Sequence, residues 1–523
     1  MSVNGEAAPH GVLSDEETLH KLGYAQELMR RMSGFSNFAV SFTIISILSG
    51  CLTLFYFGMD LGGPAVIIWG WLGVGVMTLL VGLAMAEVCS SYPTAGGLYY
   101  WSAKLAPKNG PAWSWFTGWF NFIGQVAVTA GIDFGAAFFI NAFLNLQFGL
   151  GFGHWETLLI FAIVLGLHGL LNQFGIRLVA RLNDISVWWH ILGVLIIVAV
   201  LTFAPSHHLP AGQVFTGLFN NSGLHIGWWY IIPVGLLTAQ YTFTGYDASA
   251  HMTEETHSAA TSGPRGIVMS IVVSLVAGFV LLLGMVFAIQ GPIGGAKYLA
   301  AAAAGSAAPA QIWQDALGVT GAKFLLLIAI GAQLFCGMSS ITANSRMIYA
   351  FSRDGALPYS RVWHQVNKRT RTPTNAIWLG ATGALILGLP YLWNGVAYGA
   401  VTSIAVIGLY IAYVLPTFLR RRQGANFVPG PWSLGKWSAP VGWAAVVWVA
   451  FIAILFMLPQ FGPVTSGGTL DLNTFNYAVV AVIVVIGFAG IWWVTSAKNW
   501  FTGPKVQGTA EEMAAIEHEL EQV

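Results

Sequence analysis

The sequence is poor in charged residues. Lys, Arg, Asp and Glu together make up 8% of its 523 residues, whereas soluble globular proteins carry about a quarter. The formal net charge is only +1, so there is no global field to attract a nucleic acid or another polyanion. This composition argues against a disordered chain, a nucleic-acid-binding protein and an ordinary soluble enzyme.

Cysteine is scarce, and motifs for catalysis or cofactor binding are missing as well. Cys51, Cys89 and Cys336 lie in apolar stretches without metal-ligand spacing, which predicts reduced core residues. The sequence contains no phosphate-binding glycine loop, no paired catalytic acids and no nucleophile–base pair. We therefore expect no enzyme activity, no cofactor, no metal site and no transport driven by ATP.

Apolar residues, in contrast, make up 56% of the chain, and 62 glycines and 22 tryptophans suit packed membrane helices with aromatic belts. A membrane span needs about 20 mostly apolar residues. By this rule the sequence predicts an all-α membrane protein. Its 12 transmembrane helices are expected over residues 36–58, 64–88, 112–143, 157–172, 184–203, 228–250, 266–290, 322–350, 376–394, 398–419, 439–458 and 476–497.

The distribution of basic residues predicts the orientation in the membrane. With a cytosolic N-terminus, all but two of the 22 Lys and Arg residues fall on cytosolic segments, the exceptions being Lys297 and Lys323. This bias follows the positive-inside rule. If a helix had been omitted or added, the basic residues would have fallen on both sides of the membrane. We expect a plasma-membrane protein with both termini in the cytosol. Residues 1–33 then form a tail, not a cleaved signal peptide, and 498–523 form a second tail.

Two spans contain residues that interrupt a helix near the bilayer centre. The first has Ser49 and Gly50 at its midpoint, and the sixth has Gly245 followed two residues later by Asp247. Exposed backbone at that depth is tolerated where it lines a cavity or binds a ligand. Breaks in spans one and six are typical of an inverted five-plus-five repeat. Glycine that serves only helix packing is the alternative interpretation.

This pattern predicts the domain organisation. The first repeat covers 34–203 and the second covers 228–419, while 438–497 hold two extra C-terminal helices.

Several segments resemble those of amino acid–polyamine–organocation (APC) permeases. Glu87–Tyr99 resembles the loop after the second span of these permeases, and Asn344–Pro358 resembles the end of their eighth span. Leu22–Arg31, Phe35–Ala39 and His251–Glu255 are similar to the amino acid/choline transporter (ACT) branch, which carries GABA, choline and other amino acids. The resemblance implies a LeuT-type fold, in which spans 1, 2, 6 and 7 rock against a scaffold of spans 3, 4, 8 and 9.

The substrate site is expected where the two breaks meet. Half-helix N-termini offer N–H donors to a carboxylate, and half-helix C-termini offer carbonyl groups to an ammonium group. The candidate residues are Ile47, Ser49, Gly50, Cys51, Phe243, Thr244, Gly245 and Tyr246. Phe243 and Tyr246 could present aromatic faces to an amine, or they could serve packing alone. Amino acid permeases usually have Gly-Ser-Gly at the first break, and Leu48 departs from this pattern, which keeps choline-like substrates open.

Only two of the 21 acidic residues lie deep in spans, Asp133 and Asp247. A carboxylate there costs about 2.5–3.5 kcal/mol on insertion scales, so each needs a reason for its position. Asp247 is expected to hold the second break open, with direct amine binding as the alternative. Asp133 ends a stripe spaced by four residues, which predicts a face toward the water-filled pathway. The stripe comprises Asn121, Gln125, Thr129 and Asp133, and Gln125 is predicted to lie nearest the substrate.

The resemblance also places His190 where proton-coupled relatives have a lysine. This implies a proton-carrying group that bridges spans one and eight, and histidine can titrate near neutral pH. Its expected partners are carbonyl groups near Ser46–Ser49 and the hydroxyls of Ser339, Ser340 or Thr342. A neutral histidine between helices is the alternative. His168 is expected to be structural, and Glu254 and Glu255 are expected to be surface charges that contact loops or take part in gating.

Together these features predict a secondary active transporter, a symporter that imports an amino acid such as GABA or a related amine with protons. A choline or polyamine carrier of the same fold, an exchanger and a channel-like facilitator are the alternatives. The expected partners are the small-molecule substrate, the coupling proton and the lipid bilayer, and not nucleic acid.

Overall fold

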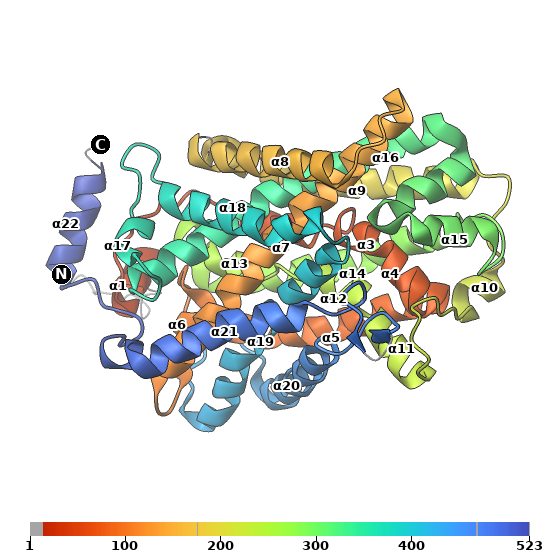
Figure 1. Ribbon diagram of the computed structural model, residues 1–523. Coiled ribbons are helices and arrows are strands. Elements are labelled where there is room, and N and C mark those ends of the chain that lie inside the picture. Colours follow the sequence, from red (N-terminus) through yellow and green to blue (C-terminus); the bar gives the residue numbers. More distant parts are fainter. Residues whose placement is uncertain (1–13, 175, 467–468, 522–523) are drawn as a thin grey trace, which may run out of the picture.

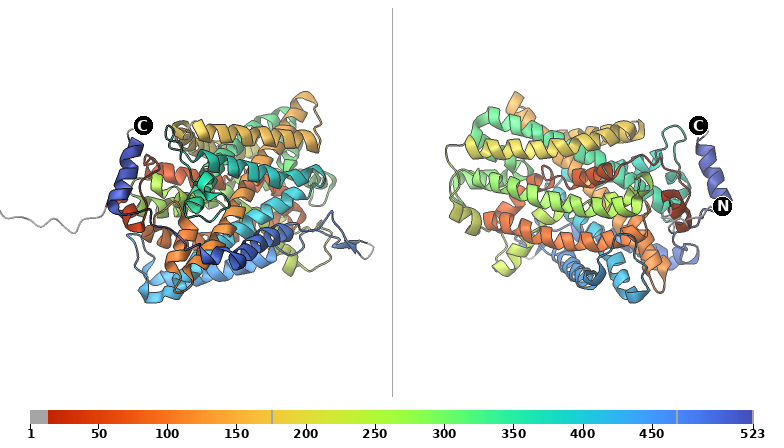
Figure 2. Two further views of the ribbon diagram at one scale, coloured as in Figure 1. Left: turned by 60° about the vertical axis from the view of Figure 1, so that its left-hand side comes forward. Right: turned by 180° about the vertical axis from the view of Figure 1, so that it is seen from behind.

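The computed structural model describes residues 14–174, 176–466 and 469–521. Its long helices lie side by side, and α1 (Asp15–Leu22) and α22 (Ala510–Glu521) are found together at one end of the bundle (Figures 1 and 2). We call this end the terminal face and the opposite end the far face.

Within the described residues, 11 helical segments are long and apolar enough to cross a membrane, which confirms the predicted class of all-α membrane protein. One of them is Gly34–Thr53. The others contain α5 (Gly63–Ser91), α7 (Gly110–Phe148), α8 (His154–Phe174), α9 (Ile176–Phe203), α14 (Ala259–Phe287), α16 (Ala308–Arg353), α18 (Thr374–Gly388), α19 (Ala397–Gln423), α20 (Ser438–Leu455) and α21 (Ala478–Thr495). The count differs from the predicted 12 because the sixth predicted span is divided into short helices.

The first span is interrupted close to the predicted position. Its first part, α2 (Gly34–Ile45), ends at Ser46, whose φ of 34° and ψ of 83° lie in the left-handed region. The chain becomes helical again as α3 (Gly50–Thr53) and α4 (Phe55–Asp60). A serine in this conformation is uncommon, so the neighbouring helices must hold the break in place.

The sixth span consists of α11 (Trp228–Gly235), α12 (Leu237–Thr242) and α13 (Ala248–His251). Between α12 and α13, Gly245 has a φ of +90°, and a Cβ atom there would lie 2.2 Å from Cγ2 of Ile44. Glycine adopts this conformation without penalty and permits so close an approach. The two breaks therefore lie against each other.

Small residues also allow the long helices to pack closely. A Cβ atom on Gly408 of α19 would lie 2.9 Å from Cα of Gly124 on α7. Similarly, a Cβ atom on Gly278 of α14 would lie 2.1 Å from Cζ2 of Trp71 on α5. Such approaches are typical of membrane helices, where association depends on van der Waals packing.

Shorter elements connect the spans. The α-helices among them are α6 (Gly97–Leu105), α10 (Ala211–Thr216), α15 (Ala296–Ala303) and α17 (Ser360–Trp363). The 3-10 helices are η1 (Thr253–Glu255), η2 (Gly305–Ala307), η3 (Leu389–Leu392), η4 (Gly424–Asn426), η5 (Gly435–Trp437) and η6 (Ala497–Asn499). The strands β1 (Thr465–Ser466) and β2 (Thr469–Leu470) pair antiparallel. The helix α16 starts well before the predicted eighth span, and it bends at Gly318, where φ is 74° and ψ is 178°.

Residues 19–31 and 505–517 form what we call the terminal clasp. The backbone N–H of Lys505 and the hydroxyl of Tyr24 both donate to the carboxylate of Asp354, each over 3.0 Å. The backbone N–H of Gln26 donates to Glu517 Oε1 over 2.5 Å. The described parts of both predicted tails are therefore docked on the terminal face, while 1–13 and 522–523 lie outside the described residues. The repeat boundaries remain predictions.

Candidate functional site

A cavity of about 970 Å³ opens at the far face. It lies between the end of α7, the start of α16, the start of α19 and the segment 460–477. Among the lining residues that the structure describes, none is Asp, Glu, Lys, Arg or His, and the polar ones are mainly Asn, Gln, Ser and Thr. The cavity therefore exerts no strong preference for a cation or an anion.

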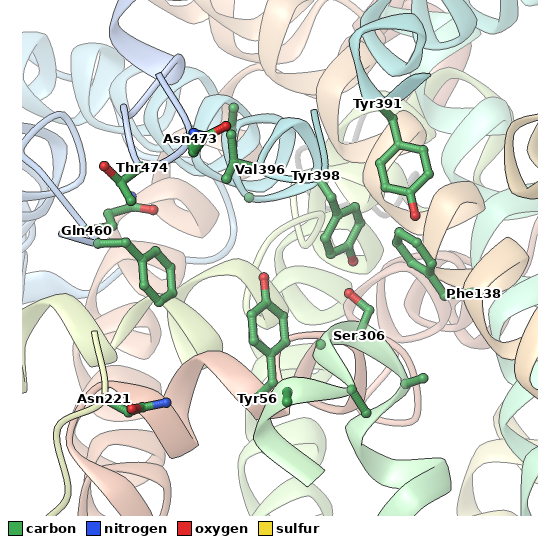
Figure 3. Close-up of a pocket in the computed structure, with 18 of the residues that line it drawn as sticks. Tyr56, Phe138, Asn221, Ser306, Tyr391, Val396, Tyr398, Gln460, Asn473 and Thr474 are labelled. Atoms are coloured by element: carbon green, nitrogen blue, oxygen red, sulfur yellow. The ribbon is translucent and has the colours of Figure 1, made fainter. Parts of the chain in front are cut away.

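Aromatic side chains line one side of this cavity. Figure 3 shows Tyr56, Phe138 and Tyr398 close together there. The rings of Phe138 and Tyr398 meet edge-on with their centroids 5.1 Å apart. Tyr398 is 4% exposed, so this side of the cavity is continuous with the packed interior of the bundle.

Beneath the aromatic side chains, two glycines of α7 make room for polar groups from other helices. A Cβ atom on Gly131 would lie 2.4 Å from the hydroxyl oxygen of Tyr241, and one on Gly135 would lie 2.9 Å from Nε2 of Gln333. Within the described residues, neither that hydroxyl nor that amide nitrogen has a hydrogen-bond partner. A buried polar group left unpaired costs about 1–3 kcal/mol, so these atoms are suited to a ligand.

The first break supplies further donors at the same place. The hydroxyl of Ser49 donates to Gln333 Oε1 over 2.6 Å, which joins the break to α16. The N–H groups of Ser49 and Gly50 both donate to the Ser46 carbonyl. In the described part of the chain, the N–H groups of Ile47 and Leu48 make no such backbone bond. The backbone N–H donors left free at the first break are therefore those of Ile47 and Leu48, and not those of Ser49 and Gly50. Leu48 was not among the predicted substrate-binding residues.

The other candidate residues of the breaks are held by protein contacts. Phe243 stacks on Trp71 with ring centroids 4.4 Å apart, and Tyr246 packs on Tyr413 at 4.8 Å. The hydroxyl of Thr244 donates to the Tyr241 carbonyl, the N–H of Gly245 donates to the Tyr413 hydroxyl, and the thiol of Cys51 donates to the Ile47 carbonyl. The geometry therefore favours packing for the two aromatic side chains.

The polar stripe of α7 is buried, and each of its four side chains contacts a residue on another element. Its side chains are at most 2% exposed. Asn121 lies 3.3 Å from His251, Gln125 donates to Asp247 over 2.7 Å, Thr129 lies 2.8 Å from Ser340, and Asp133 lies 3.1 Å from His168. In this conformation the stripe thus connects α7 to its neighbours, and its place on a water-filled pathway remains a prediction.

The terminal face is closed by two buried ion pairs. Arg346 Nε lies 2.7 Å from Glu255 Oε1, and Arg353 Nη2 lies 3.1 Å from Glu254 Oε1. Arg30 covers the pairs and donates to the carbonyl of Thr253 over 2.9 Å. Glu254 and Glu255 are 0% and 5% exposed, so the prediction of surface charges was wrong. We call these two pairs the terminal gate.

Comparison with known proteins identifies the family. The profile of the family described as "Amino acid permease" matches residues 32–489. The chain belongs to this family. The permease is 44% identical over 506 residues to the amino-acid permease BAT1 of Arabidopsis thaliana, covering 94% of this chain and 96% of that protein. It is 34% identical over 505 residues to the GABA-specific permease of Saccharomyces cerevisiae, covering 94% and 86%. It is thus a multi-pass membrane transporter of amino acids and not an enzyme.

His190 of the permease contacts the first break but not span eight. Its Nε2 lies 2.7 Å from the hydroxyl oxygen of Ser46, and its Nδ1 donates to the carbonyl of Ser186 over 2.8 Å. The expected hydroxyls of span eight have other partners: Ser339 binds Asn183, Ser340 binds Thr129, and Thr342 binds Asn172. The expected contact with the break is present, while the bridge to span eight is absent from the described contacts.

Two polar groups of the permease escaped the sequence analysis. Gln333 is the single amide side chain in the apolar run 324–338, and this isolation could have marked it. Tyr241 lies two residues before Phe243. Nothing in the sequence marked it as a binding residue, because tyrosine is also common in packed interiors.

Asp60 of the permease, which lies beyond the first span at the far face, gives a pH-dependent prediction. Burial raises the pKa of this carboxyl from 3.8 to about 6, although Asn221 donates to it over 3.0 Å. The pKa of Asp60 is higher in the folded protein than in the unfolded chain, so the folded protein binds this proton more tightly. The protonated carboxyl therefore contributes folding stability below about pH 4, and this contribution is lost as the pH rises toward about 6. Asp60→Asn is therefore expected to raise the melting temperature at about pH 8, and by less at about pH 5. Thermal unfolding of the purified protein measures this, and equal shifts at both pH values would contradict it.

Proposed function

We propose that the permease imports GABA or a similar amino acid across the plasma membrane by proton-coupled alternating access, with both termini in the cytosol. The observation that supports this most directly is the asymmetry of the two faces. The far-face cavity leads to the aromatic side chains above the breaks, whereas the terminal gate closes the opposite face. A carrier exposes its site to one side at a time, and two broken helices at mid-depth are typical of inverted-repeat transporters.

The polar groups at the first break support a zwitterionic substrate. The N–H groups of Ile47 and Leu48, together with the Gln333 amide, offer donors to a carboxylate. The hydroxyl of Tyr241 accepts a hydrogen bond from an ammonium group. An uncharged entrance cavity also suits a substrate without net charge. A choline-like substrate has no carboxylate and would leave these donors unpaired.

Uptake by proteoliposomes tests the proposal. We would offer radiolabelled GABA, L-alanine, L-lysine and choline separately, under an imposed proton gradient and without one. We expect saturable uptake of GABA or L-alanine, with accumulation above the external concentration only when the gradient is present. Flux that does not saturate would indicate a channel, and uptake of choline alone would indicate the organocation alternative.

His190 provides a separate prediction about coupling. If it carries the coupling proton, uptake should depend on the proton gradient, be indifferent to sodium and fall as the external pH rises through the titration of the ring. His190→Ala should lose concentrative uptake. His190→Lys should retain binding, with its pH dependence shifted to alkaline values, because lysine holds a proton to higher pH than histidine. Accumulation by His190→Ala, or a strict sodium requirement of the wild type, would refute this role.

A further inference from the structure

A second cavity, of about 280 Å³, lies beside the terminal gate. It is bounded by the segment 29–36, which leads into α2, by 179–183 of α9 and by 370–371 before α18. Glu255 of the gate also lines it. The cavity therefore adjoins three segments that are far apart in the sequence and one of the residues that close the terminal face.

Three arginines, one from each of these segments, line the cavity: Arg31, Arg181 and Arg371. Arg31 and Arg181 are exposed, and their guanidinium groups make no hydrogen bond or ion pair with any residue that the structure describes. Arginine keeps its positive charge at every physiological pH. The far-face cavity differs in this respect, because it is lined mainly by uncharged polar and aromatic side chains. We call the second cavity the arginine cavity.

Acidic side chains do not neutralise this charge. Among the described lining residues Glu255 is the only acid, and it is paired with Arg346 at 2.7 Å. Asp184 lies next to the cavity and accepts a hydrogen bond over 3.3 Å from Ser36, which lines it. Three guanidinium groups thus adjoin a single carboxylate without an arginine partner, so the cavity attracts an anion. The planar fork of donors on arginine matches the oxygens of a phosphate group.

Arg371 is held in place before any ligand binds. Its Nε and Nη2 donate to the carbonyl of Glu27 over 3.1 and 2.7 Å, and its backbone N–H donates to the carbonyl of Asn367 over 2.7 Å. Its φ of 51° is uncommon for a residue other than glycine. Its Nη1 makes no hydrogen bond within the described part of the chain and remains available to a ligand. A donor that is already fixed loses little conformational freedom on binding.

The other walls of the arginine cavity favour a phosphate group attached to an apolar molecule. Met29, Met32, Val179 and Met252 line it beside the arginines. Inorganic phosphate would leave these side chains without a partner. Pockets that bury a whole drug-sized ligand enclose about 300–1,000 Å³, so this cavity has room for a headgroup but not for a complete lipid.

The surroundings of the cavity indicate where such a molecule comes from. Phe35 and Leu178, each next to a lining residue, are exposed on helices that are long and apolar enough to cross the membrane. Side chains of this kind face lipid. In the orientation proposed above, this face lies at the cytosolic leaflet, where anionic phospholipids bind clusters of basic residues.

We propose that the arginine cavity binds the phosphate group of an anionic phospholipid, and that the bound lipid holds the terminal face closed. The backbone N–H groups of Arg31 and Met32 donate to the carbonyl of Glu255 over 3.0 and 2.8 Å, so the cavity and the gate share this segment. A phosphate group in contact with all three arginines joins the segment to α9 and to the loop before α18. Because these contacts exist only while the three segments are together, the lipid stabilises the closed state. The proposal uses the proposed orientation, but no assumption about the substrate or the coupling ion.

Lipid binding to the purified permease tests the site. The probe is dioctanoyl phosphatidylglycerol, counted on the protein by native mass spectrometry during a titration. We expect saturable binding, and binding of dioctanoyl phosphatidylcholine at least about tenfold weaker, because its ammonium group cancels the negative charge. Inorganic phosphate at the same concentration should not displace the lipid. Displacement would indicate a site for free phosphate, and equal binding of the two lipids would indicate no preference for anions. Either result would overturn the proposal.

Glutamine variants assign the binding to the cavity. Arg31→Gln and Arg181→Gln should each weaken the binding of phosphatidylglycerol at least about tenfold, since each removes a charged donor. Both residues are exposed and have no described side-chain partner, so the fold should be retained. Arg361→Gln is the matched control, because Arg361 is an exposed arginine of α17 outside the cavity. Unchanged affinity in both cavity variants, or an equal loss in the control, would refute the site.

Thiol labelling tests the closing role. Thr94 is fully buried next to Ala95, whose N–H donates to Glu254 of the gate over 2.9 Å. A thiol introduced by Thr94→Cys therefore reacts with a membrane-impermeant maleimide only when the terminal face opens. The rate is measured in nanodiscs of phosphatidylcholine alone and in nanodiscs in which phosphatidylglycerol replaces one quarter of it. Protein without the substitution gives the background from the three buried native thiols.

We expect phosphatidylglycerol to slow the labelling at least about threefold, and to slow it less than about 1.5-fold when Arg31→Gln and Arg181→Gln are combined. The surface charge of the nanodisc is the same for both proteins, so the difference between them reports on the cavity. Arg361→Gln should respond as the wild type does. Equal slowing in the combined variant, or no slowing in the wild type, would overturn the closing role. Neither measurement involves a transported substrate or a proton gradient, so the result is independent of the proposed coupling.

Discussion

Substrate binding is expected to be lost when leucine replaces Gly50 or Gly245. A Cβ atom on Gly50 would lie 2.9 Å from Cα of Thr242, and one on Gly245 would lie 2.2 Å from Cγ2 of Ile44. A larger side chain therefore pushes the breaks apart and displaces the donors at Ile47. Overpacking of this kind destabilises the affected conformation by about 1–3 kcal/mol. Where the substrate-binding conformation alone bears about 3 kcal/mol, the affinity falls more than about a hundredfold. Binding of the transported amino acid to purified protein measures the effect.

Gly73→Leu is the matched control for these variants. Nothing lies within 4 Å of a Cβ atom at Gly73, which is exposed on the surface of α5. Its affinity should equal that of the wild type. Insertion of all three variants should be retained, because it depends on the apolar spans as wholes. Unchanged affinity in both break variants would place the substrate site elsewhere.

Removing one partner of a terminal-gate ion pair is expected to lower the stability of the protein strongly and to open the terminal face. Arg346→Ala leaves Glu255 as a buried charge without its partner at 2.7 Å. Breaking a buried ion pair in this way costs about 3–5 kcal/mol. The variant should show a markedly lower melting temperature, and its terminal face should be labelled rapidly by a thiol reagent at Thr94→Cys. Both quantities can be measured on the same purified protein.

A double variant distinguishes the effect of the ion pair on folding stability from its effect on closure of the terminal face. Arg346→Met combined with Glu255→Leu replaces the pair by apolar side chains and should recover most of the lost stability. It should still label faster than the wild type, since no ion pair then closes the face. Lys368→Ala is the control, because its pair with Glu519 is exposed at 62% and 69%. A wild-type labelling rate in Arg346→Ala would contradict the gating role of the pair.

Local sequence signals were sufficient for the spans and the breaks. Apolar length located the long apolar helices, Gly245 lies within the second break, and Gly50 lies where the chain becomes helical again after the first. The left-handed conformation of Ser46 was not predictable, because serine has no preference for it and only tertiary contacts maintain it. The bend in α16 at Gly318, where φ is 74° and ψ is 178°, was not predicted, because a single glycine in an apolar membrane segment is as common in a continuous helix.

Partners across helices could not be read from the sequence. The spacing of Asn121 and Gln125 predicted a shared face, but whether that face meets water or another helix depends on how α7 is rotated in the bundle. The resemblance implied that His190 reaches span eight, whereas its second contact is with Ser186 on its own helix. Contacts of this kind depend on rotation and crossing angle, which no periodicity specifies.

The terminal clasp has a consequence for biogenesis. The backbone N–H of Ala25 donates its hydrogen bond to Oε1 of Gln507, a residue 482 positions later in the chain. Because synthesis proceeds from the N-terminus, the segment 19–31 leaves the ribosome long before its partners exist. The spans can insert and pack during this interval, but the cover over the terminal gate cannot form. A newly inserted permease therefore passes through a stage in which its helices are in place and this mouth is uncovered.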